Sequence, residues 1–442
     1  MAAVTGSRRY VVDRDVIRRG DRVAGGSPLR TFVLSEAGQR TMSALERGEP
    51  VERTELVDRL LAAGVIHPVP SGRPRRGVPG REWAEVVTIV TPAFGRPDRV
   101  APGSILVDDG SAPPIPGARV RLDRNRGPGA ARNAGLGLVT TPFVAFVDTD
   151  VDLPTGWLAG LMPHFDDPDV VLVAPRVRSR AGPSRLERYE RRHSPLDLGR
   201  RPANVGPGRL TSYVPTAAVV ARTDAVRRVG GFDEDLRFGE DVDLVWRLVD
   251  AGGVVRYEPG TIVVHPPRTS WRSWCRQRID YGGSAAALAR RHPDRLAPWH
   301  GRLGTVAPWW LIARGRVVVG VAATIATQAW QTAWVRRSTG LPAADAARLV
   351  TAFASATASA TARAVRRGWW PMLAVAATRS PTTRRVLLVS AVAAVGPVRL
   401  ADDVAYSIGV WRGVVAHRTI RPLVPSIAGM GRHVPADRER AG

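Results

Sequence analysis

The sequence predicts an α/β fold with a parallel sheet. Between residues 86 and 177, five apolar runs of strand character follow one another, with helical segments between several of them. The runs are continuously apolar and not alternating, which is typical of parallel strands that helices cover on both faces. Acidic residues directly follow two of the runs, at the sheet edge where open α/β folds bind their ligands.

The strands are assigned to five runs, namely VVTIVTPAF, SILVDDGS, ARVRLD, FVAFVDTD and VVLVAPRV, starting at residues 86, 104, 118, 143 and 170. Helices are predicted over 128–139 and 155–165, the second favoured by Pro154 just before it. The segment GRPDRVAPG between the first two strands is too short for the usual crossover helix, and Pro102 discourages one. Either the chain has a local deletion here, or the first βαβ unit is irregular.

Residues 1–67 are predicted to form a separate small module. TFVLSEAG indicates a short strand, after which Ser35 caps a helix over 36–46. A second helix is expected over 52–63, and VIHPV then resumes as a strand. This strand–helix–helix–strand order is winged-helix-like, and its open sheet edge suits an extended peptide. Residues 68–84 are predicted to be a linker, because they are rich in Pro, Gly and Arg.

Residues 271–442 are predicted to be a helical region rich in Ala and Arg. Its longest uncharged stretch, Val317–Val335, barely reaches the length of a membrane span and contains Thr and Gln. Helices that lie on a membrane or pack together are therefore favoured over a span. The expected location is the cytoplasm, with peripheral contact to the inner face of the cell membrane left open.

Composition excludes several classes of site. All 64 basic residues are arginine, which excludes a Schiff-base lysine and a lysine-dependent P-loop. The single cysteine, Cys275, excludes an internal disulfide and a cysteine-rich metal site.

The net charge of +24 would suit a protein that binds nucleic acid, anionic lipid or phosphorylated substrates. Because the arginines are dispersed and form no recognition helix, no nucleic-acid partner is predicted. The polar N-terminus is no signal peptide.

Carboxylates gather at the end of the fourth predicted strand. Asp148 and Asp150 are two residues apart, so in extended geometry their side chains point the same way. They would repel each other unless a divalent cation, carried by a nucleotide diphosphate, lay between them. The other interpretation is a polar loop in which Asp152 caps the next helix.

Two further motifs indicate nucleotide binding. Asp108 and Asp109 end the second strand, where a carboxylate can accept hydrogen bonds from a base or ribose. The segment NRGPGAARNAGL, residues 125–136, is a Gly-rich turn that enters a helix, so its backbone N–H groups and Arg132 could hold phosphate. Each motif alone is also compatible with an ordinary turn.

Later in the chain, Glu240 and Asp241 open an amphipathic helix, where an acidic pair can also serve the helix dipole. His265 ends a strand, and a single histidine there is more often structural.

These motifs, in this order, resemble glycosyltransferase family 2 proteins, which have the GT-A nucleotide-diphospho-sugar transferase fold. The resemblance covers about residues 86–270 and rests on VTIVTPAF, VDDGS, NRGPGAARNAGL, FVDTD and GFDEDLRFGEDVDL. It implies that Thr91 and Pro92 line the nucleotide site and that Asp109, with Asp108, reads the base. Asp148 would approach the ribose and the metal.

For the reaction, the resemblance implies an inverting, metal-dependent hexosyltransferase. Asp150 would ligate Mn²⁺ or Mg²⁺, and His265 would complete the metal shell. Asp241 would be the general base, supported by Glu240. The segment SWRSWCRQRIDYGGS is loosely similar to a Q-x-x-R-W motif, so Arg276 and Arg278 become weak candidates for acceptor or diphosphate contacts; a solvated basic helix is the alternative.

The whole chain, with SPLRTFVLSEAGQRTMSAL and LVDRLLAAGVIHP in its N-terminal module, looks like the glycosyltransferases of mycofactocin systems in actinobacteria. That resemblance implies a UDP-glucose donor, a peptide-derived acceptor and β-linked glucose as product, with the module tethered beside the active site. One alternative is a family 2 transferase of cell-envelope polysaccharide or glycolipid synthesis. Another is a noncatalytic peptide-binding adaptor, against which the intact Asp148, Asp150 and Asp241 argue.

Overall fold

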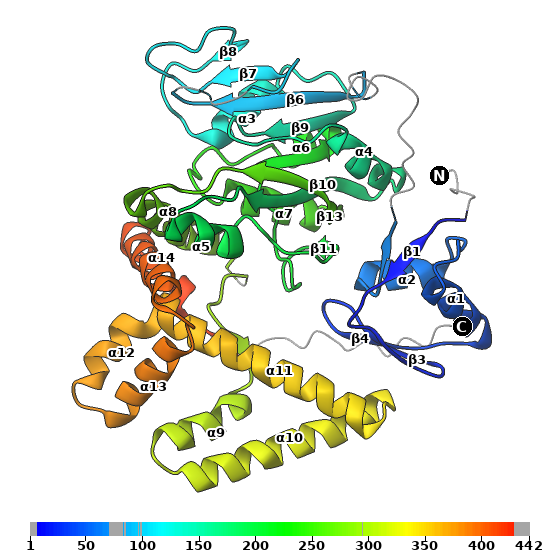
Figure 1. Ribbon diagram of the computed structural model, residues 1–442, viewed down its shortest axis with the longest axis vertical. Coiled ribbons are helices and arrows are strands. Elements are labelled where there is room, and N and C mark those ends of the chain that lie inside the picture. Colours follow the sequence, from blue (N-terminus) through cyan, green and yellow to red (C-terminus); the bar gives the residue numbers. More distant parts are fainter. Residues whose placement is uncertain are drawn as a thin grey trace. The chain divides into compact units, whose positions relative to one another are not determined.

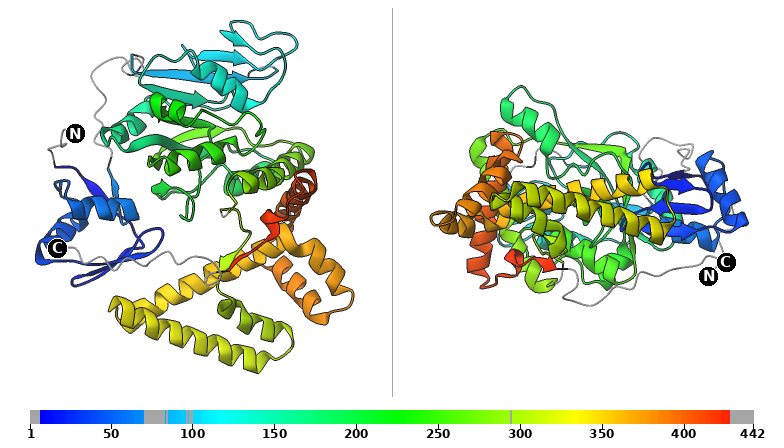
Figure 2. Two further views of the ribbon diagram at one scale, coloured as in Figure 1. Left: turned by 180° about the vertical axis from the view of Figure 1, so that it is seen from behind. Right: turned by 90° about the horizontal axis from the view of Figure 1, so that it is seen from below.

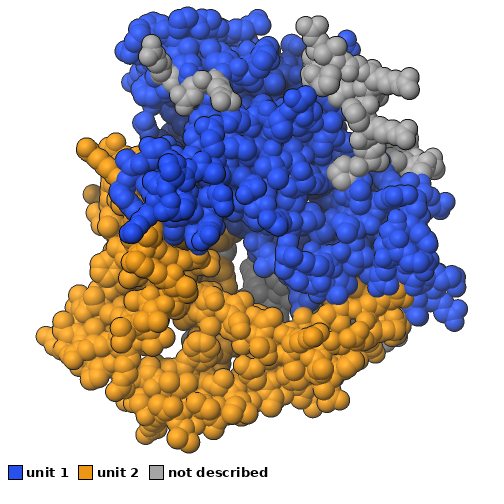
Figure 3. All heavy atoms as spheres, in the orientation of Figure 1, with its two compact units in different colours: residues 1–16, 25–30, 36–271 blue, residues 17–24, 31–35, 272–442 orange. Residues whose placement is uncertain are grey.

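The computed structural model describes residues 7–69, 83, 85–95, 97, 100–293 and 295–427. The chain divides into two compact units, coloured in Figure 3. The first comprises residues 1–16, 25–30 and 36–271, and the second comprises residues 17–24, 31–35 and 272–442. The predicted border at 270 lies one residue from this division. Most of the predicted linker lies outside the described residues.

An eight-stranded mixed sheet forms the centre of the first unit, in the order β11-β13-β10-β12-β9-β6-β7-β8 (Figure 1). Its strands are β6 (Val87–Ala93), β7 (Ile105–Asp108), β8 (Val120–Arg121), β9 (Phe143–Val147), β10 (Val170–Ser179), β11 (Ala203–Val205), β12 (Ala218–Arg222) and β13 (Val254–His265). The helices around it are α3 (Pro128–Leu136), α4 (Trp157–Leu161), η1 (Met162–Asp166), α5 (Arg185–His193), α6 (Thr223–Arg228) and α7 (Glu240–Asp250).

The predicted α/β class is confirmed, and five of these strands lie where the apolar runs placed them. The strands β11 and β12 were missed. The strand β12 lies between β9 and β10 and is antiparallel to both, so the sheet is mixed and not parallel as predicted. Its residues are buried on consecutive positions, as are those of β9, because both faces of the sheet are covered. The connection between β6 and β7 contains no helix among its described residues, as the short segment predicted.

The helix α3 begins right after the Gly-rich turn. Gly127 has a φ of 97°, which favours glycine, and Pro128 occupies the first helical turn, where its missing N–H costs nothing. On the inner face, a Cβ at Gly135 would lie 2.4 Å from Val90 Cγ1 of β6. Glycine at this position therefore lets α3 pack closely on the sheet, which sets the position of Arg132 one turn earlier.

The N-terminal module contains more strands than the sequence predicted. Its elements are β1 (Tyr10–Val12), β2 (Ile17–Arg19), β3 (Arg22–Gly25), β4 (Arg30–Val33), α1 (Glu36–Glu46), α2 (Glu55–Ala63) and β5 (Ile66–Pro68). The helix α1 has the predicted bounds, and α2 starts three residues late because Thr54, not an earlier residue, caps it. β1 pairs with β5, and β2, β3 and β4 form a second small sheet.

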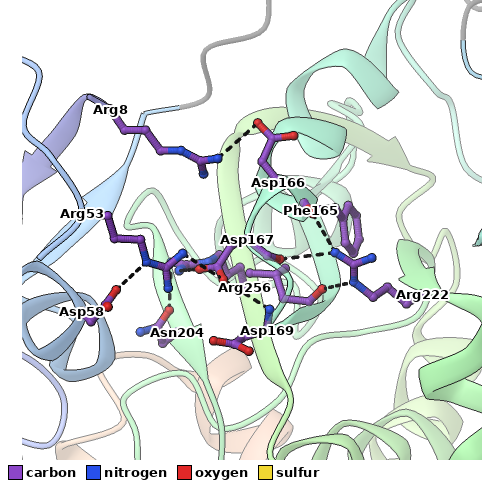
Figure 4. A network of polar contacts seen from close by, with 11 residues as sticks. Arg8, Arg53, Asp58, Phe165, Asp166, Asp167, Asp169, Asn204, Arg222 and Arg256 are labelled. Atoms are coloured by element: carbon purple, nitrogen blue, oxygen red, sulfur yellow. Dashed lines mark hydrogen bonds and ion pairs between the residues drawn. The ribbon is translucent and has the colours of Figure 1, made fainter. Parts of the chain in front are cut away.

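Within the first unit, buried ion pairs hold the module to the catalytic sheet (Figure 4). Asp167, 7% exposed, lies 3.2 Å from Arg53 of the module and 3.5 Å from Arg256 of β13. Asn204 of β11 accepts from Arg256 at 3.2 Å and donates to the Leu61 carbonyl at 2.5 Å. The Arg53–Asp167 ion pair and the Asn204–Leu61 hydrogen bond are therefore the contacts of this network that cross between the two parts.

This anchor lies at the amino end of β10, just before Val170. The candidate metal ligand His265 lies opposite Ser179, at the carboxyl end of the same strand. A ten-residue strand spans about 30 Å. The module therefore contacts the sheet at the amino ends of β10 and β13, whereas His265 lies at their carboxyl ends. The expectation that the module lies beside the active site is wrong for this reason.

Asp167→Ala should loosen the module. The substitution takes the Asp167 carboxylate from Arg53, which keeps its pair with Asp58, and from the buried Arg256; breaking a buried ion pair costs about 3–5 kcal/mol. Hydrogen exchange of residues 36–69, the part of the module that contains Arg53, should accelerate strongly. Asp166→Ala is the matched control, since Asp166 is more than half exposed and lies 3.7 Å from Arg8; it should change exchange little. Equal exchange in both variants would rule out the Asp167 anchor.

The second unit is helical, as predicted. Its helices are α8 (Trp271–Arg291), α9 (Leu303–Ala313), α10 (Val317–Thr339), α11 (Ala343–Ala364), the π-helical turn η2 (Val365–Trp369), α12 (Trp370–Ala377), α13 (Pro381–Val392), α14 (Pro397–Ala416) and η3 (Arg421–Leu423), with a short parallel pair of β14 (His300–Gly301) and β15 (Ser426–Ile427). Figure 2 shows α9, α10 and α11 as neighbouring rods. None of the helices in the described part of the chain combines the length and apolar content of a membrane span.

Candidate active site

Arg132 joins three elements of the first unit. Its side chain is 3% exposed; Nη1 donates to Glu240 Oε1 at 2.9 Å, and Nη2 donates to Asp148 Oδ1 at 2.7 Å. The guanidinium carbon lies 5.3 Å from the ring centroid of Phe232. Burial lowers the pKa of Arg132, but the two carboxylates outweigh it and raise that pKa. The helix α3, the end of β9 and the start of α7 are thus connected through one buried cation.

The loop after β9 folds back onto the end of β13. The backbone N–H of Asp152 donates to the Val264 carbonyl at 2.7 Å, and the N–H of Val264 donates to the Asp152 carbonyl at 3.0 Å. This pairing brings Asp150 beside His265, with Oδ2 of Asp150 3.1 Å from Nε2 of His265. The sequence placed these two residues in one site, and the structure brings them together across 115 positions of the chain.

The hydrogen bonds of His265 orient its ring. Nδ1 lies 2.7 Å from the Pro266 carbonyl, so Nδ1–H donates there and Nε2 faces Asp150. Burial lowers the pKa of His265, but the hydrogen bond and the charge of Asp150 raise it above its ordinary value. Burial likewise raises the pKa of Asp150, and the hydrogen bond with His265 overcomes that effect and holds the pKa below its ordinary value.

Asp148, Asp150 and His265 are compatible with a divalent cation that a diphosphate also ligates. Carboxylates suit Mg²⁺ and Mn²⁺, and Mg²⁺ commonly takes only one or two carboxylates together with substrate phosphates. Asp150 and His265 are close enough to share one ion, while Oδ1 of Asp148 is already paired with Arg132. Over the described ranges, no three His, Cys, Asp or Glu side chains are grouped closely enough to hold a metal ion. A cation bound by Asp150 and His265 would need further ligands, which a diphosphate could supply.

Glu240 and Asp241 begin α7 directly after Gly239, which has a φ of 84°. Oδ1 of Asp241 accepts from the Val242 N–H at 2.8 Å. Burial, followed by the negative charge of Glu240, raises the pKa of Asp241 to about 7. Burial also raises the pKa of Glu240, although Arg132 opposes it. A carboxylate with a pKa near 7 can accept a proton efficiently at neutral pH.

Asp108 and Asp109 are both buried and point into the protein. Asp108 accepts from the N–H groups of Ser111 at 2.8 Å and Ile115 at 3.1 Å. The two oxygens of Asp109 accept from the N–H groups of Arg126 at 2.7 Å and Gly127 at 2.9 Å. Asp109 thus shapes the Gly-rich turn and occupies two of the N–H groups that the sequence assigned to phosphate. Base recognition by this pair stays a prediction.

Thr91 and Pro92, predicted to line the nucleotide site, lie buried in β6. Thr91 is fully buried, and its hydroxyl has no hydrogen-bond partner in the described structure. In the second unit, Arg278 of α8 is 2% exposed, donates to Asp402 at 3.2 Å and stacks over Trp274. Arg278 is therefore held by its own unit, whereas Arg276 is exposed.

Asn133 is a residue of this region that the sequence reasoning missed. Its Nδ2 donates to the Phe232 carbonyl at 2.8 Å, and its Oδ1 accepts from the Phe232 N–H at 2.8 Å. These bonds hold the loop before α7 against α3, next to Arg132. The signal was present, since a residue with low helix propensity stands inside the predicted helix.

The chain is similar in sequence to known glycosyltransferases. Residues 105–228 match the signature of the family described as Glycosyl transferase family 2. Proteins named pre-mycofactocin glycosyltransferase from two strains of Mycobacterium tuberculosis, CDC 1551 / Oshkosh and ATCC 25618 / H37Rv, are each 39% identical over 462 residues, which covers 94% of this chain and 97% of theirs. The succinoglycan biosynthesis protein ExoO of Rhizobium meliloti is 31% identical over 176 residues, 35% of this chain and 49% of its own.

Among solved structures, a mannosyltransferase from Pyrobaculum calidifontis, in complex with GDP-Man and Mn²⁺, matches 77% of this chain and 91% of its own, with 17% identity and a TM-score of 0.37. TarS of S. aureus, residues 1–349, matches 46% of this chain and 64% of its own, with 16% identity and a TM-score of 0.35.

Proposed function

Because this chain belongs to the pre-mycofactocin glycosyltransferases of glycosyltransferase family 2, we propose that it adds β-linked glucose from UDP-glucose to mycofactocin or its peptide-derived precursor. That the chain is a glycosyltransferase follows from its family; donor, acceptor and linkage are the proposal. The observation that carries the proposal is 39% identity over 94% of the chain, a share too large to leave out the whole N-terminal module. A noncatalytic adaptor does not agree with this membership.

In the proposed reaction, Asp241 takes the proton from the acceptor hydroxyl. The oxygen of that hydroxyl attacks the anomeric carbon from the face opposite the nucleotide, the bond to the diphosphate breaks, and the configuration inverts. General-base assistance of this kind contributes about 10²–10⁴-fold to a rate. Glu240 supports the base indirectly, since its negative charge helps to keep the pKa of Asp241 near 7.

On the donor side, Asp150 and His265 would hold Mn²⁺ or Mg²⁺, with Asp148 alongside. A bound ion would supply positive charge to the departing diphosphate. The protein itself fixes the positions of these ligands: the Asp152–Val264 pairing positions Asp150, and Arg132 positions Asp148. Thr91, Pro92, Asp108 and Asp109 remain the proposed nucleotide-binding residues.

The module of residues 7–69 would bind a peptide-derived acceptor at a distance from the chemistry. Its anchor lies about 30 Å from His265, the length of β10. An extended chain advances about 3.3–3.6 Å per residue, so a peptide that joins both places needs roughly nine residues. A trimmed acceptor of one or two residues would reach only one of them.

The test uses purified full-length protein with UDP-glucose, Mn²⁺ or Mg²⁺, and the precursor peptide or the mature cofactor. We expect release of UDP and an acceptor heavier by one hexose, and EDTA should abolish both. Asp150→Asn should weaken donor binding by about tenfold or more, since even outer-shell changes cost that much at metal sites. Asp152→Asn is the control, because its side chain pairs with Arg180 and its backbone pairing is unaffected.

Three outcomes would count against parts of the proposal. Full activity in EDTA would exclude the metal role. If the protein used another nucleotide sugar and did not use UDP-glucose, the proposed donor would be wrong. Transfer to lipid-linked sugar, with both peptide-derived acceptors unmodified, would favour the cell-envelope alternative.

A further inference from the structure

The helix α10 has the reverse of the polarity expected for a helix in water. Its large apolar residues point outward: Val318 is 82% exposed, Ile325 64% and Trp330 59%. Its polar side chains face its neighbours instead, since four of them line a cleft that α9 and α11 complete, namely Thr324, Thr327, Gln328 and Gln331. A helix whose outer face is solvated normally shows the opposite arrangement. The outer face of α10 therefore suits an apolar environment.

Neighbouring helices of the second unit extend this apolar surface. Trp310 of α9 is 53% exposed, and Leu388, Val389 and Val392 of α13 are each at least 65% exposed. The two helices are in contact: Arg385 of α13 donates to the Ala313 carbonyl at the end of α9 at 3.0 Å. Such a cluster exceeds the scattered apolar residues that are normal on a protein surface. We refer to the outward residues of α9, α10 and α13 as the apolar helix surface.

Exposed arginines flank the apolar helix surface. Residues 301–400 contain 13 arginines and one acidic residue, Asp345, while Arg366 and Arg367 pair with Asp403 just beyond this range. Asp345 is 3% exposed and pairs with Arg19 at 2.7 Å, so it does not offset the exposed arginines. Arg314 and Arg316 precede α10, and Arg336 and Arg337 lie in its last turn; all four are exposed. An uncharged segment of 19 residues, 317–335, about 28 Å long as a helix, thus has a pair of arginines at each end.

We propose that the apolar helix surface docks on a bilayer that contains anionic lipid, with α10 lying in the plane of the interface. Trp side chains are enriched at this depth, and arginines keep their charge at the headgroups while their stems lie along apolar surface. A span does not account for the surface, since no described helix qualifies as one. A second copy of the chain would bring the same arginines against their equivalents, and like charges repel. Lipid phosphates carry the complementary charge.

The experiment measures co-sedimentation of full-length protein with phosphatidylcholine vesicles, with and without phosphatidylglycerol. We expect at least tenfold stronger binding to the anionic vesicles. The triple variant Ile325→Gln, Trp330→Gln, Trp334→Gln should bind at least a hundredfold more weakly, because three exposed residues that would enter the acyl boundary are lost. The matched control is Val11→Gln, Leu138→Gln, Leu210→Gln, three exposed apolar residues of the first unit, which should bind within twofold of the wild type.

A second variant tests the charge. Arg314→Gln with Arg316→Gln should weaken binding to anionic vesicles about fivefold per arginine, the fold-change that corresponds to about 1 kcal/mol for each. Brominated acyl chains should quench the Trp fluorescence of the wild type, which provides a readout that needs no variant.

The proposal is overturned if the triple variant binds like the control, if phosphatidylcholine alone binds equally well, or if brominated lipids do not quench. It is also overturned if light scattering without vesicles finds a dimer that the triple variant abolishes. None of these measurements uses a sugar donor, so their outcome is independent of the proposed function.

Discussion

Asp241→Asn should lower kcat by two or more orders of magnitude while UDP still binds. The amide cannot accept the acceptor's proton, and general-base losses are typically about 10²–10⁴-fold. UDP binding should persist because the proposed donor ligands, Asp150 and His265, come from the ends of β9 and β13 and not from α7. Steady-state glucosyl transfer and UDP titration by calorimetry measure the two quantities separately.

The control is Asp250→Asn, the same change at the exposed end of the same helix, which should leave kcat within twofold. Turnover near the wild-type rate in Asp241→Asn would move the base to another residue. Glu240 would be the next candidate, and Glu240→Gln would test it.

The same residue predicts how stability depends on pH. A pKa of about 7 in the folded protein lies above the ordinary value of an aspartate. The protonated side chain of Asp241 therefore contributes to the free energy of unfolding. This contribution is complete below about pH 4 and is lost as the pH rises through about 7, because the buried carboxyl then has to ionise. Asp241→Asn avoids this loss, so at pH 8 the variant should be more stable than the wild type, by on the order of 2 kcal/mol, and equally stable at pH 4. In the wild type, kcat/KM should rise with pH up to about 7 and then level off.

Arg132→Leu should cause the largest loss of stability among single changes at this site. It leaves the carboxylates of Asp148 and Glu240 buried without their cation, which costs about 3–5 kcal/mol. Arg132→Lys should recover only part of the lost stability. An ammonium group lacks the planar guanidinium geometry that lets Arg132 bond to Asp148 and Glu240 at once. Urea unfolding followed by Trp fluorescence gives the midpoints.

Arg126→Leu is the matched control for Arg132. Arg126 lies on the turn before the same helix and pairs with Glu234 at 2.5 Å, but both side chains are largely exposed. Its loss should cost less than about 1 kcal/mol. If both variants unfolded at the same urea concentration, Arg132 would not be the centre of the site.

The sequence predicted what local pattern controls. Continuous apolar runs identified β6, β7, β9 and β10, since strands buried on both faces cannot alternate. Ser35 and Gly64 marked the ends of α1 and α2 within a few residues, and α7 began at Glu240 as predicted. The strands β1 to β3, β11 and β12 were missed, because three to five residues carry too little periodicity to separate them from loops.

Residue chemistry in the sequence was enough to identify the family and to select Asp148, Asp150, Glu240 and Asp241 as a group. The contacts of these residues depended on tertiary structure. Arg132 meets Glu240 across 108 positions because the first turn of α7 lies next to α3, and this contact pairs a predicted phosphate ligand with two carboxylates inside the protein. Likewise, Asp167 meets Arg256 because β13 pairs with β10, and it meets Arg53 only because the module packs against the amino end of β10. Local periodicity specifies which segments are strands, whereas the sheet order and the packing of helices on it determine which distant charges are buried together.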